Sequence, residues 1–257
     1  MAGTDPSEGL SIIIPTYNER DNIEQLMRDL RAVEPRLQRP LEVVLVDDNS
    51  PDGTACMAER LGRDLPMELR ILARSGPQGL GGAIATGLRM CQWNLVCVMD
   101  ADLSHPATLV PSLVDSLDGV DGVVASRYVS GGRIESWPLV RRLTSAVATV
   151  IARIFLQIEQ KDPLSGFFIL RRSAFQDANV TGDGNKPLLE ILVSVRPRVK
   201  EIPYRFCNRK NGESKLNGDS ILDFVRLLSR LRSAAATGIQ ARRRVAERGT
   251  LDRELTG

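Results

Sequence analysis

The sequence NLVCVMDADLSHP, residues 94–106, decides the fold that we expect for this chain. Its apolar run is typical of a buried strand, which ends where Asp100 and Asp102 place two carboxylates two residues apart. Residues i and i+2 of an extended segment project to the same side, so both carboxylates face the same space. Because like charges so close together repel, the pair either raises one pKa or recruits a cation.

A divalent ion is the cation that suits such a pair. Oxygen ligands favour Mg²⁺ or Mn²⁺, and Mg²⁺ commonly joins one or two carboxylates to substrate phosphates. The D-x-D pattern at a strand end therefore indicates a metal that clamps a diphosphate. The alternative is a solvated turn without a ligand, but the acids that end the neighbouring strands favour the metal.

Further apolar runs, separated by helical patterns, predict the rest of the sheet. Strands are expected at 10–15, 41–46, 67–73, 94–100 and 121–126, and helices at 20–34, 54–62 and 81–91. Strands that alternate with helices of this size predict an α/β fold, with a parallel sheet and helices on both of its faces. In such sheets ligands bind beyond the carboxyl ends of the strands.

Polar clusters follow three of the strands at these carboxyl ends. They are TYNE (16–19), DDNS (47–50) and DADLSH (100–105). Their carboxylates can accept hydrogen bonds from ribose hydroxyls or base N–H groups, whereas helix capping is the alternative for Asn18, Asp21 and Asp52. The loop GPQGLGGA (76–83) lacks the G-x-G-x-x-G pattern of dinucleotide sites, so we expect a tight turn with close helix packing there.

Composition limits the class of protein. The length of 257 residues suits one large domain, or a domain with an appendage. The net charge of +2 does not indicate a nucleic-acid partner. The four cysteines form no C-x-x-C pair, which favours free thiols in a reducing compartment. The first residues lack the pattern of a signal peptide. The uncharged core of 139–158 covers only 143–152, too short for a membrane-spanning helix.

The pattern changes after about residue 127. A long helix is expected at 139–158, strands at 165–172 and 199–206, and a helix at 186–195, before an arginine-rich tail. Basic side chains flank the acids, and arginine suits two-pronged recognition of phosphate, although surface charge is the simpler reading of any one of them. They are Arg127, Arg141, Arg142, Arg209 and Lys215. The one histidine, His105, precedes a proline, which predicts a turn residue and gives little support to a histidine-based nucleophile.

Seven segments together resemble a known family. They are IIIPTYNE (12–19), VLVDDNSPDGT (44–54), VMDADLSHP (98–106), SRYVSGG (126–132), WPLVRRLTS (137–145), KDPLSGFF (161–168) and NGESKL (211–216). In this order and spacing they resemble the dolichol- or polyprenol-phosphate mannose synthases of glycosyltransferase family 2, which have the GT-A fold. The resemblance runs from about residue 10 to 230.

The resemblance implies a division of the chain. It implies a catalytic domain over 1–230, with a Rossmann-like nucleotide-sugar-binding sheet and flanking helices in 10–126 and an acceptor-binding part in 127–220. The basic tail, 231–257, is then helical or disordered.

The resemblance also implies roles at matching positions. The nucleoside is expected at Pro15, Tyr17, Glu19, Val46 and Asp48, and the metal and diphosphate at Asp100, Ala101 and Asp102. Ser104 stands near the metal where family members often carry Gln, so a water could intervene between its shorter side chain and the ion. The acceptor phosphate is expected at Arg127, Arg141 and Ser145, and the donor phosphates and a closing loop at Arg209 and Lys215. Asp100, Asp102 and Arg127 are the expected catalytic residues.

The chemistry of such a transfer agrees with this set of residues. A phosphate monoester has its second pKa near 6, so at pH 7 it is already a nucleophile and needs no general base. The difficulty is to bring two anions together, which requires a metal on the departing diphosphate and arginines on the incoming phosphate. Direct attack by the phosphate would invert the anomeric carbon.

The resemblance therefore implies a metal-dependent enzyme, with Mg²⁺ or Mn²⁺, that transfers mannose from GDP-mannose to a polyprenyl (dolichyl) phosphate. Two alternatives stay open: a UDP-sugar-dependent relative that makes, for example, a polyprenyl-phosphate glucose, and a non-catalytic nucleotide-binding module. We expect a peripheral protein on the cytoplasmic face of a membrane, with small membrane-anchoring subunits as possible partners. The helix at 139–158 would either lie in the membrane interface or dock on the sheet, or do both with different faces.

Overall fold

The computed structural model describes residues 8–76, 79–135, 137–178, 185–207 and 222–234. Arg209 and Lys215, for which we expect roles at the donor phosphates, lie outside these ranges, as do residues 235–257 of the tail.

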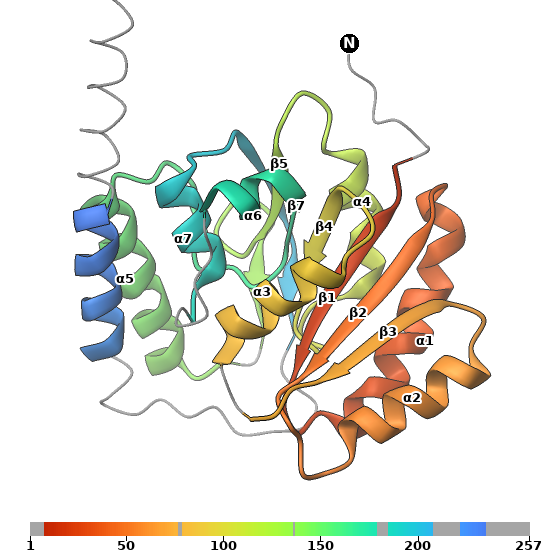
Figure 1. Cartoon of the computed structure of the whole chain (residues 1–257). Helices are drawn as coiled ribbons and strands as arrows, with labels where there is room; N and C mark the ends of the chain where they lie inside the picture. Colours follow the sequence, from red (N-terminus) through yellow and green to blue (C-terminus); the bar gives the residue numbers. More distant parts are fainter. Residues whose placement is uncertain (1–7, 77–78, 136, 179–184, 208–221, 235–257) are drawn as a thin grey trace, which may run out of the picture.

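A mixed sheet of seven strands lies at the centre of the described chain, in the order β3-β2-β1-β4-β7-β5-β8 (Figure 1). The strands are β1 (Leu10–Thr16), β2 (Leu41–Asp47), β3 (Glu68–Ala73), β4 (Leu95–Val98), β5 (Gly122–Ser126), β7 (Phe168–Arg171) and β8 (Val199–Pro203). Every neighbouring pair is parallel except the two pairs that β7 makes with β4 and β5. A second, small sheet pairs β6 (Arg133–Ile134) with β9 (Arg205–Phe206).

The five strands for which a parallel sheet is predicted do run parallel, and β7, from the later part of the chain, runs opposite to them. The chain enters β7 from the edge of the sheet where β4 ends. The position of Gly166 shows this, since a Cβ placed on it would lie 3.3 Å from the Asp100 carboxylate. A strand that starts at this edge must run opposite to the strands that finish there. The sequence shows the apolar run of β7 but not the side from which the chain approaches it.

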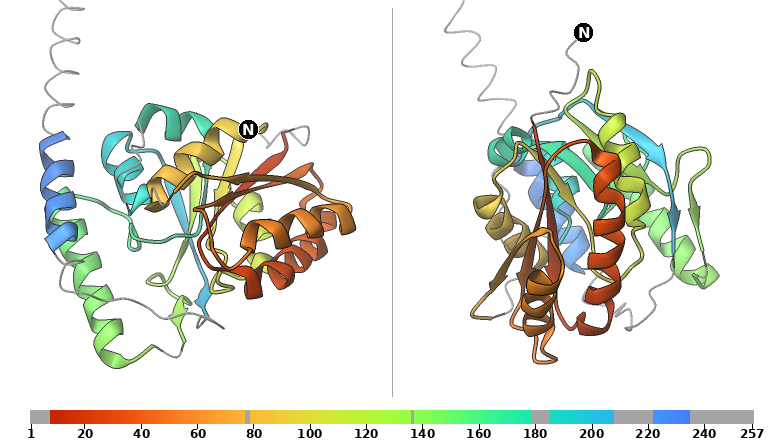
Figure 2. Two further views of the ribbon diagram at one scale, coloured as in Figure 1. Left: turned by 60° about the horizontal axis from the view of Figure 1, so that its bottom comes forward. Right: turned by 90° about the vertical axis from the view of Figure 1, so that its right-hand side faces the viewer.

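Helices cover both faces of the sheet, as expected (Figure 2). One face carries α1 (Arg20–Leu37), α2 (Thr54–Asp64) and η1 (Ala107–Leu109) with α4 (Val110–Asp115). The other carries α3 (Gly79–Met90), α5 (Leu139–Leu156), α6 (Arg172–Ala178), α7 (Pro187–Ser194) and the helical residues 222–234. In β1 the side chains alternate between the two layers, with Ile12 and Ile14 toward α1 and Ile13 toward α3.

The glycine-rich segment packs its helix closely onto the sheet. A Cβ placed on Gly87 would lie 2.7 Å from the Ile13 side chain, so α3 could not lie this near to β1 with a larger residue there. Gly81 and Gly82 are buried as well. The helix that the segment 76–83 opens thus packs closely on the sheet, with the closest approach at Gly87, beyond the segment itself.

The helical residues 222–234 belong to the same core. Leu228 and Leu231 are buried in the cluster that contains Ala152 and Leu156 of α5. The domain boundary that we expect at residue 230 thus falls within a packed helix.

Candidate active site

Two carboxylates lie just beyond the end of β4. Asp102 is buried and Asp100 leaves 35% of its side chain exposed. Leu103 adopts a φ of 62°, and the turn brings Ser104 back toward Asp102. Asp102 Oδ1 accepts hydrogen bonds from the backbone N–H of Ser104 at 3.0 Å and from its hydroxyl at 2.5 Å. Ser104 therefore orients Asp102 in this structure, and Asp100 offers the accessible carboxylate.

His105 holds the other side of the turn. It lies in a bend, as expected before a proline, but it is also buried and stacks on Phe167 with 5.1 Å between ring centroids. Its Nδ1 accepts a hydrogen bond from the backbone N–H of Asp100 at 3.0 Å, and its Nε2 lies 3.8 Å from Asp100 Oδ2. The ring thus fixes the backbone and the carboxylate of Asp100 together.

The donor set suits a hard cation that shares its ligands with a substrate. No group of three or more His, Cys, Asp or Glu side chains that could hold a metal occurs among the described residues. Asp100 and Asp102 would supply two carboxylates, and the remaining positions would fall to phosphate oxygens and water, as Mg²⁺ commonly has them. Gly166 keeps space beside Asp100, since a Cβ there would lie 3.3 Å from Oδ2.

The ends of β1 and β2 form the expected nucleoside edge. Pro15 pairs with Val46 in the register, and the backbone N–H of Asp48 donates to the carbonyl of Thr16 at 2.9 Å. Tyr17 is 55% exposed at this edge. Val46 is wholly buried, so it packs beneath this edge and offers no accessible surface to a ligand in this structure.

The adjacent aspartates Asp47 and Asp48 have different partners. Asp47 accepts hydrogen bonds from the Thr16 hydroxyl at 2.9 Å and from the N–H and hydroxyl of Ser50 at 2.8 and 2.6 Å. Asp48 instead forms a buried ion pair with Arg74, whose guanidinium also donates to the Gly79 carbonyl. Asp47 is thus occupied in closing its turn, and Asp48 is held by the loop after β3.

Asp52 accepts hydrogen bonds at the start of two helices, although the N-cap residue of α2 is Gly53. One of its oxygens accepts from the N–H and hydroxyl of Thr54, and the other accepts from the N–H of Arg20. Partial burial disfavours its charge, but these hydrogen bonds outweigh burial and lower the pKa of Asp52. Glu19 accepts a hydrogen bond from Asn22 at 2.7 Å and stands at the start of α1 without a side-chain cap bond.

Arg127 follows β5 and forms a buried, two-pronged ion pair with Asp162. Its Nε and Nη2 donate to the two carboxylate oxygens at 2.8 and 2.7 Å, and its backbone N–H donates at 2.9 Å. Glu201 of β8 in turn accepts hydrogen bonds from the backbone N–H groups of Lys161 and Asp162. Burial disfavours the guanidinium charge, but Asp162 outweighs it and raises the pKa of Arg127.

An aromatic cluster joins the carboxylates of the β4 turn to the arginines. His105 lies edge-on to Phe206 at 5.8 Å, and Phe206 lies edge-on to Trp137 at 5.1 Å. The Arg127 Cζ lies 5.7 Å from the centroid of the Phe206 ring. The Arg141 Cζ, from the first turn of α5, lies 4.0 Å from the centroid of Trp137.

Beside this cluster lies a cleft of about 370 Å³ lined by Arg127, Arg133 and Arg142. Glu135 is the acid in its lining, and it lies 3.8 Å from Arg205. The cleft is therefore positive. Arg141, expected at the acceptor phosphate, does not line this cleft but stacks on Trp137, and Ser145 shares a hydrogen bond of 2.9 Å with the Tyr128 hydroxyl.

Comparison with known proteins identifies the family. The family model described as glycosyl transferase family 2 matches residues 11–178. The chain belongs to glycosyltransferase family 2. It is therefore an enzyme of the class that transfers sugars, and the non-catalytic module is no longer needed to explain the site.

Three relatives of this glycosyltransferase carry closely related names. A dolichol-phosphate mannosyltransferase of Pyrococcus furiosus is 39% identical over 226 residues, which are 86% of this chain and 63% of the relative. One of Saccharomyces cerevisiae is 34% identical over 86% of each chain. A polyprenol monophosphomannose synthase of Mycolicibacterium smegmatis is 31% identical over 84% of each. The chain thus spans less than two thirds of the archaeal relative and most of the other two.

Solved structures show the same fold at low identity. A glucosyl-3-phosphoglycerate synthase from Mycobacterium tuberculosis, in complex with Mn²⁺, UDP-glucose and phosphoglyceric acid, has a TM-score of 0.64 at 18% identity over 89% of this chain and 80% of its own. A mannosyltransferase from Pyrobaculum calidifontis, in complex with GDP-Man and Mn²⁺, has a TM-score of 0.56 at 19% identity over 93% and 76%. The predicted GT-A fold is confirmed by these neighbours.

Sequence reasoning missed several residues of the site. Asp162 and Trp137 stand inside segments that carry the family resemblance, so their place in those segments was the available signal. Glu201 gave none, because it follows Lys200 in the strand VKEIP (199–203), where an exposed charge is the simplest reading. Lys186, at the start of α7, is half-buried and interacts electrostatically with Arg127, Asp100 and Asp162. Burial and Arg127 lower the pKa of Lys186, against the opposing effect of the two acids.

Proposed function

We propose that this glycosyltransferase transfers mannose from GDP-mannose to a polyprenyl (dolichyl) phosphate and yields polyprenyl phosphate β-mannose. The observation that carries the proposal is the aromatic cluster that sets the arginines of an acceptor site beside the carboxylates of a donor site. The names of the relatives, which match over most of the chain, support mannose and a prenyl phosphate.

The nucleotide-sugar half, 10–126, would hold the donor. GDP would lie across the ends of β1 and β2, with its base near Asp48 and its diphosphate toward Asp100 and Asp102. These two carboxylates would hold Mg²⁺ or Mn²⁺, and the ion supplies positive charge to the departing diphosphate. The Pyrobaculum neighbour that contains GDP-Man and Mn²⁺ has the same fold.

The acceptor half, 127–220, would hold the lipid phosphate. The ion pair with Asp162 uses Nε and Nη2 of Arg127, and no hydrogen bond of its Nη1 occurs among the described residues. The guanidinium has five donors in a planar fork, so one edge can hold Asp162 while another meets a phosphate. Arg142 in the cleft and Arg141 beside it would add the charge that a dianion needs.

Proton transfer has no part in this mechanism, because the acceptor phosphate is a nucleophile at neutral pH. His105 agrees with this, since it is buried and both ring nitrogens face Asp100. The residues of the chain would orient the two substrates, neutralise their charges and exclude water. Attack by the phosphate on the face opposite the diphosphate inverts the anomeric carbon.

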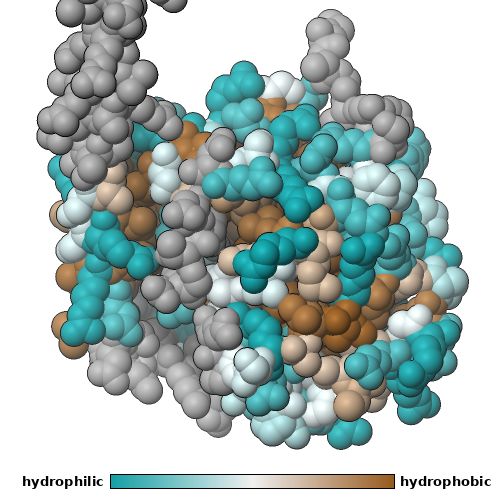
Figure 3. Space-filling view, in the orientation of Figure 1, coloured by the Kyte–Doolittle hydropathy of each residue, from teal (hydrophilic) through white to brown (hydrophobic). Residues whose placement is uncertain are grey.

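The α5 helix would provide a surface for the membrane in which such a lipid resides. Its inner stripe, with Ala152 and Leu156, packs in the core, whereas its outer stripe is apolar and exposed. The exposed side chains are Leu139, Val140, Leu143, Val147, Val150, Ile151, Ile154 and Phe155. Figure 3 shows scattered apolar residues at the left-hand edge, where Figure 1 places the helical residues 222–234 with α5 beside them.

This outer stripe would lie in the membrane interface, with arginines such as Arg142 at the headgroups. None of the helices that the structure describes has the length and apolar character to cross a membrane. Docking on the sheet and contact with a membrane are therefore compatible, since they use different faces of α5. The cytoplasmic face is the side on which GDP-mannose would be available.

The transfer assay tests the proposed function directly. Purified chain, radiolabelled GDP-mannose, a polyprenyl phosphate and Mg²⁺ or Mn²⁺ should yield an acid-labile, mannose-labelled lipid. A parallel reaction with UDP-glucose separates this donor from the UDP-sugar alternative. Transfer from UDP-glucose alone, or equal transfer in the presence of a chelator, would overturn the proposal.

Arg141→Ala should lower transfer roughly 100-fold and leave the affinity for GDP within twofold. The guanidinium would meet the acceptor phosphate, and the nucleotide would bind at the ends of other strands. Initial rates at several acceptor concentrations and calorimetric titration with GDP measure the two effects. Arg198→Ala is the matched control, because Arg198 is exposed beside Asp121 and far from the site. Loss of GDP binding in Arg141→Ala would show that Arg141 is misassigned.

The double substitution Leu143→Glu and Ile154→Glu should weaken binding to vesicles at least about tenfold, since each exposed side chain contributes apolar contact with the lipid. Co-sedimentation with vesicles of phosphatidylcholine and phosphatidylglycerol measures it. Thr108→Glu with Ser112→Glu adds the same charge at exposed positions on the opposite face of the sheet. Equal loss in both double variants would mean that charge, and not the apolar stripe, governs binding.

A further inference from the structure

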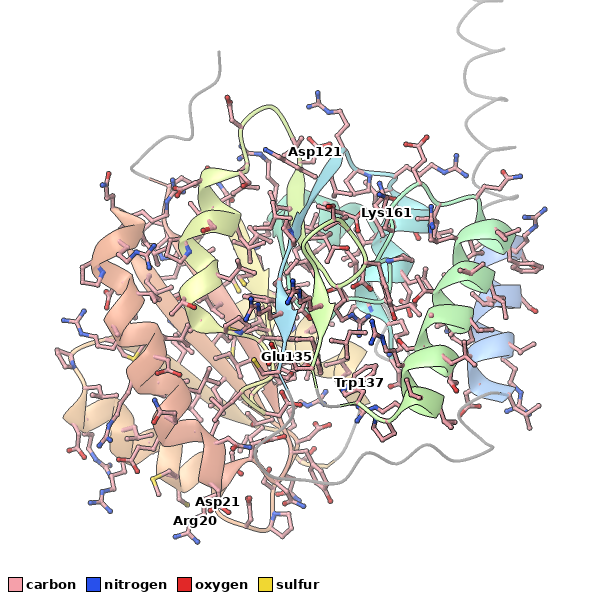
Figure 4. All side chains as sticks on the ribbon, turned by 180° about the vertical axis from the view of Figure 1, so that it is seen from behind. Arg20, Asp21, Asp121, Glu135, Trp137 and Lys161 are labelled. Atoms are coloured by element: carbon pink, nitrogen blue, oxygen red, sulfur yellow. The ribbon has the colours of Figure 1, made fainter. Side chains whose placement is uncertain are left out.

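One indole ring contacts both arginines of the proposed acceptor site. The Cζ atoms of Arg141 and Arg127 lie 4.0 and 5.9 Å from the centroid of Trp137. Figure 4 shows Trp137 near one end of α5, close to Glu135. Arg127 also lies 5.4 Å from the ring of Tyr128, so aromatic rings surround a guanidinium that Asp162 already anchors.

Two guanidinium groups at this site carry the same charge and repel each other before any substrate arrives, although Asp162 offsets part of the charge of Arg127. The negative face of an indole attracts a cation, most strongly when water is excluded. Trp137 is itself held by Phe206, which lies edge-on to it at 5.1 Å. The ring therefore offsets part of the repulsion and is fixed in position by the core.

The stacking also fixes the orientation of the Arg141 guanidinium. A guanidinium that lies on a ring has its flat face covered, and its N–H groups point outward in the plane of the fork. In Arg127, Asp162 accepts hydrogen bonds from one edge of the guanidinium. The contacts with Trp137 and Asp162 thus fix how the two guanidinium groups are oriented and how far apart they lie.

We propose that Trp137 is a positioning residue that holds Arg127 and Arg141 at the spacing at which both meet the phosphate of one acceptor. The inference rests on the proposed function, because it takes the acceptor to be a phosphate monoester. Trp137 itself need not touch the substrate. Its effect is to hold the site in its binding geometry before the substrate arrives. Without the ring, the two guanidinium groups would move apart.

Replacement of the ring tests this role. Trp137→Met and Trp137→Leu should raise the KM for polyprenyl phosphate about tenfold, while Trp137→Phe stays within about threefold of the wild type. The KM for GDP-mannose should stay within twofold in all three. Phe and Met are apolar and similar in size, so a role in packing alone predicts that Met restores activity as well as Phe.

The background Arg141→Ala gives a second measurement. There Trp137→Leu should raise the acceptor KM clearly less than it does in the wild type, because one of the two stacked cations is gone. Equal effects in both backgrounds, or a Met variant as active as the Phe variant, would overturn the inference. Unfolding midpoints recorded for each variant ensure that only folded protein is compared.

Trp93 provides the matched control, because it precedes β4 at the opposite end of the strand from Asp100 and its backbone N–H donates to Ser11. Trp93→Phe and Trp93→Met should have equal acceptor KM values. Failure of the proposed function itself would be evident in the transfer assay of the wild type, since that chain would then transfer no mannose to the lipid. An active wild type with no difference between Phe and Met at 137 would reject only the inference.

Discussion

Asp102→Asn should reduce mannosyl transfer by roughly 10²–10³-fold, the loss typical when one electrostatic group is removed from an active site. The amide oxygen can still accept the hydrogen bonds from Ser104, so the turn keeps its shape while the site loses a negative charge. With one carboxylate left, the divalent ion would be held much more weakly. Initial rates at saturating GDP-mannose, over a series of Mn²⁺ concentrations, measure the loss and its recovery at high metal.

The binding of GDP gives the sharper comparison. In the wild type Mn²⁺ should strengthen it, and in Asp102→Asn the metal should have little effect. Asp115→Asn removes an exposed carboxylate from the end of α4 and should leave both properties unchanged. If Asp102→Asn kept the full metal dependence of GDP binding, the cation would have to bind elsewhere and the proposed mechanism would be wrong.

Asp162→Ala should lower the free energy of unfolding by about 3–5 kcal/mol, because it leaves the charge of Arg127 buried without a partner. Both side chains are nearly inaccessible, with 9% of Arg127 and none of Asp162 exposed. The backbone N–H of Arg127 would lose its acceptor as well. Urea unfolding followed by circular dichroism, with the slope compared between variants, measures the change.

Asp121→Ala is the control for this prediction, since Asp121 also pairs with an arginine. Its partner Arg198 leaves 75% of its side chain exposed, and such pairs contribute about 0–1 kcal/mol. Figure 4 shows Asp121 at the end of the molecule away from Trp137. Similar losses in the two variants would mean that burial of the Arg127 pair contributes nothing beyond a surface contact.

We expect Asp162 to affect activity through Arg127. The carboxylate fixes one edge of the guanidinium, and Glu201 fixes the backbone that carries the carboxylate. The network therefore extends from β8 through the loop before β7 to the residue after β5. A site of this kind is formed before the substrate binds, which is what electrostatic stabilisation of a charged transition state requires.

Local patterns in the sequence were sufficient to predict the central strands of the sheet and the edge of the sheet where the chemistry is expected. The sequence predicts the bounds of β1, β2 and β4, and the polar residues after them, to within a few positions. This is possible because strand burial and strand ends are local properties. The carboxylates at 100 and 102 follow from the same reading. So does the close packing of α3, since glycines mark where a helix approaches a strand.

Pairing between distant residues depended on the path of the chain. Arg127 and Asp162 are 35 residues apart, and nothing in either segment specifies the other as its partner. The same holds for Asp48 with Arg74 and for the indole of Trp137 near Arg127 and Arg141. The direction of β7 is of this kind too. Side-chain partners and strand direction are set by which segments the core brings together, and that is a property of the packed structure rather than of any stretch of sequence.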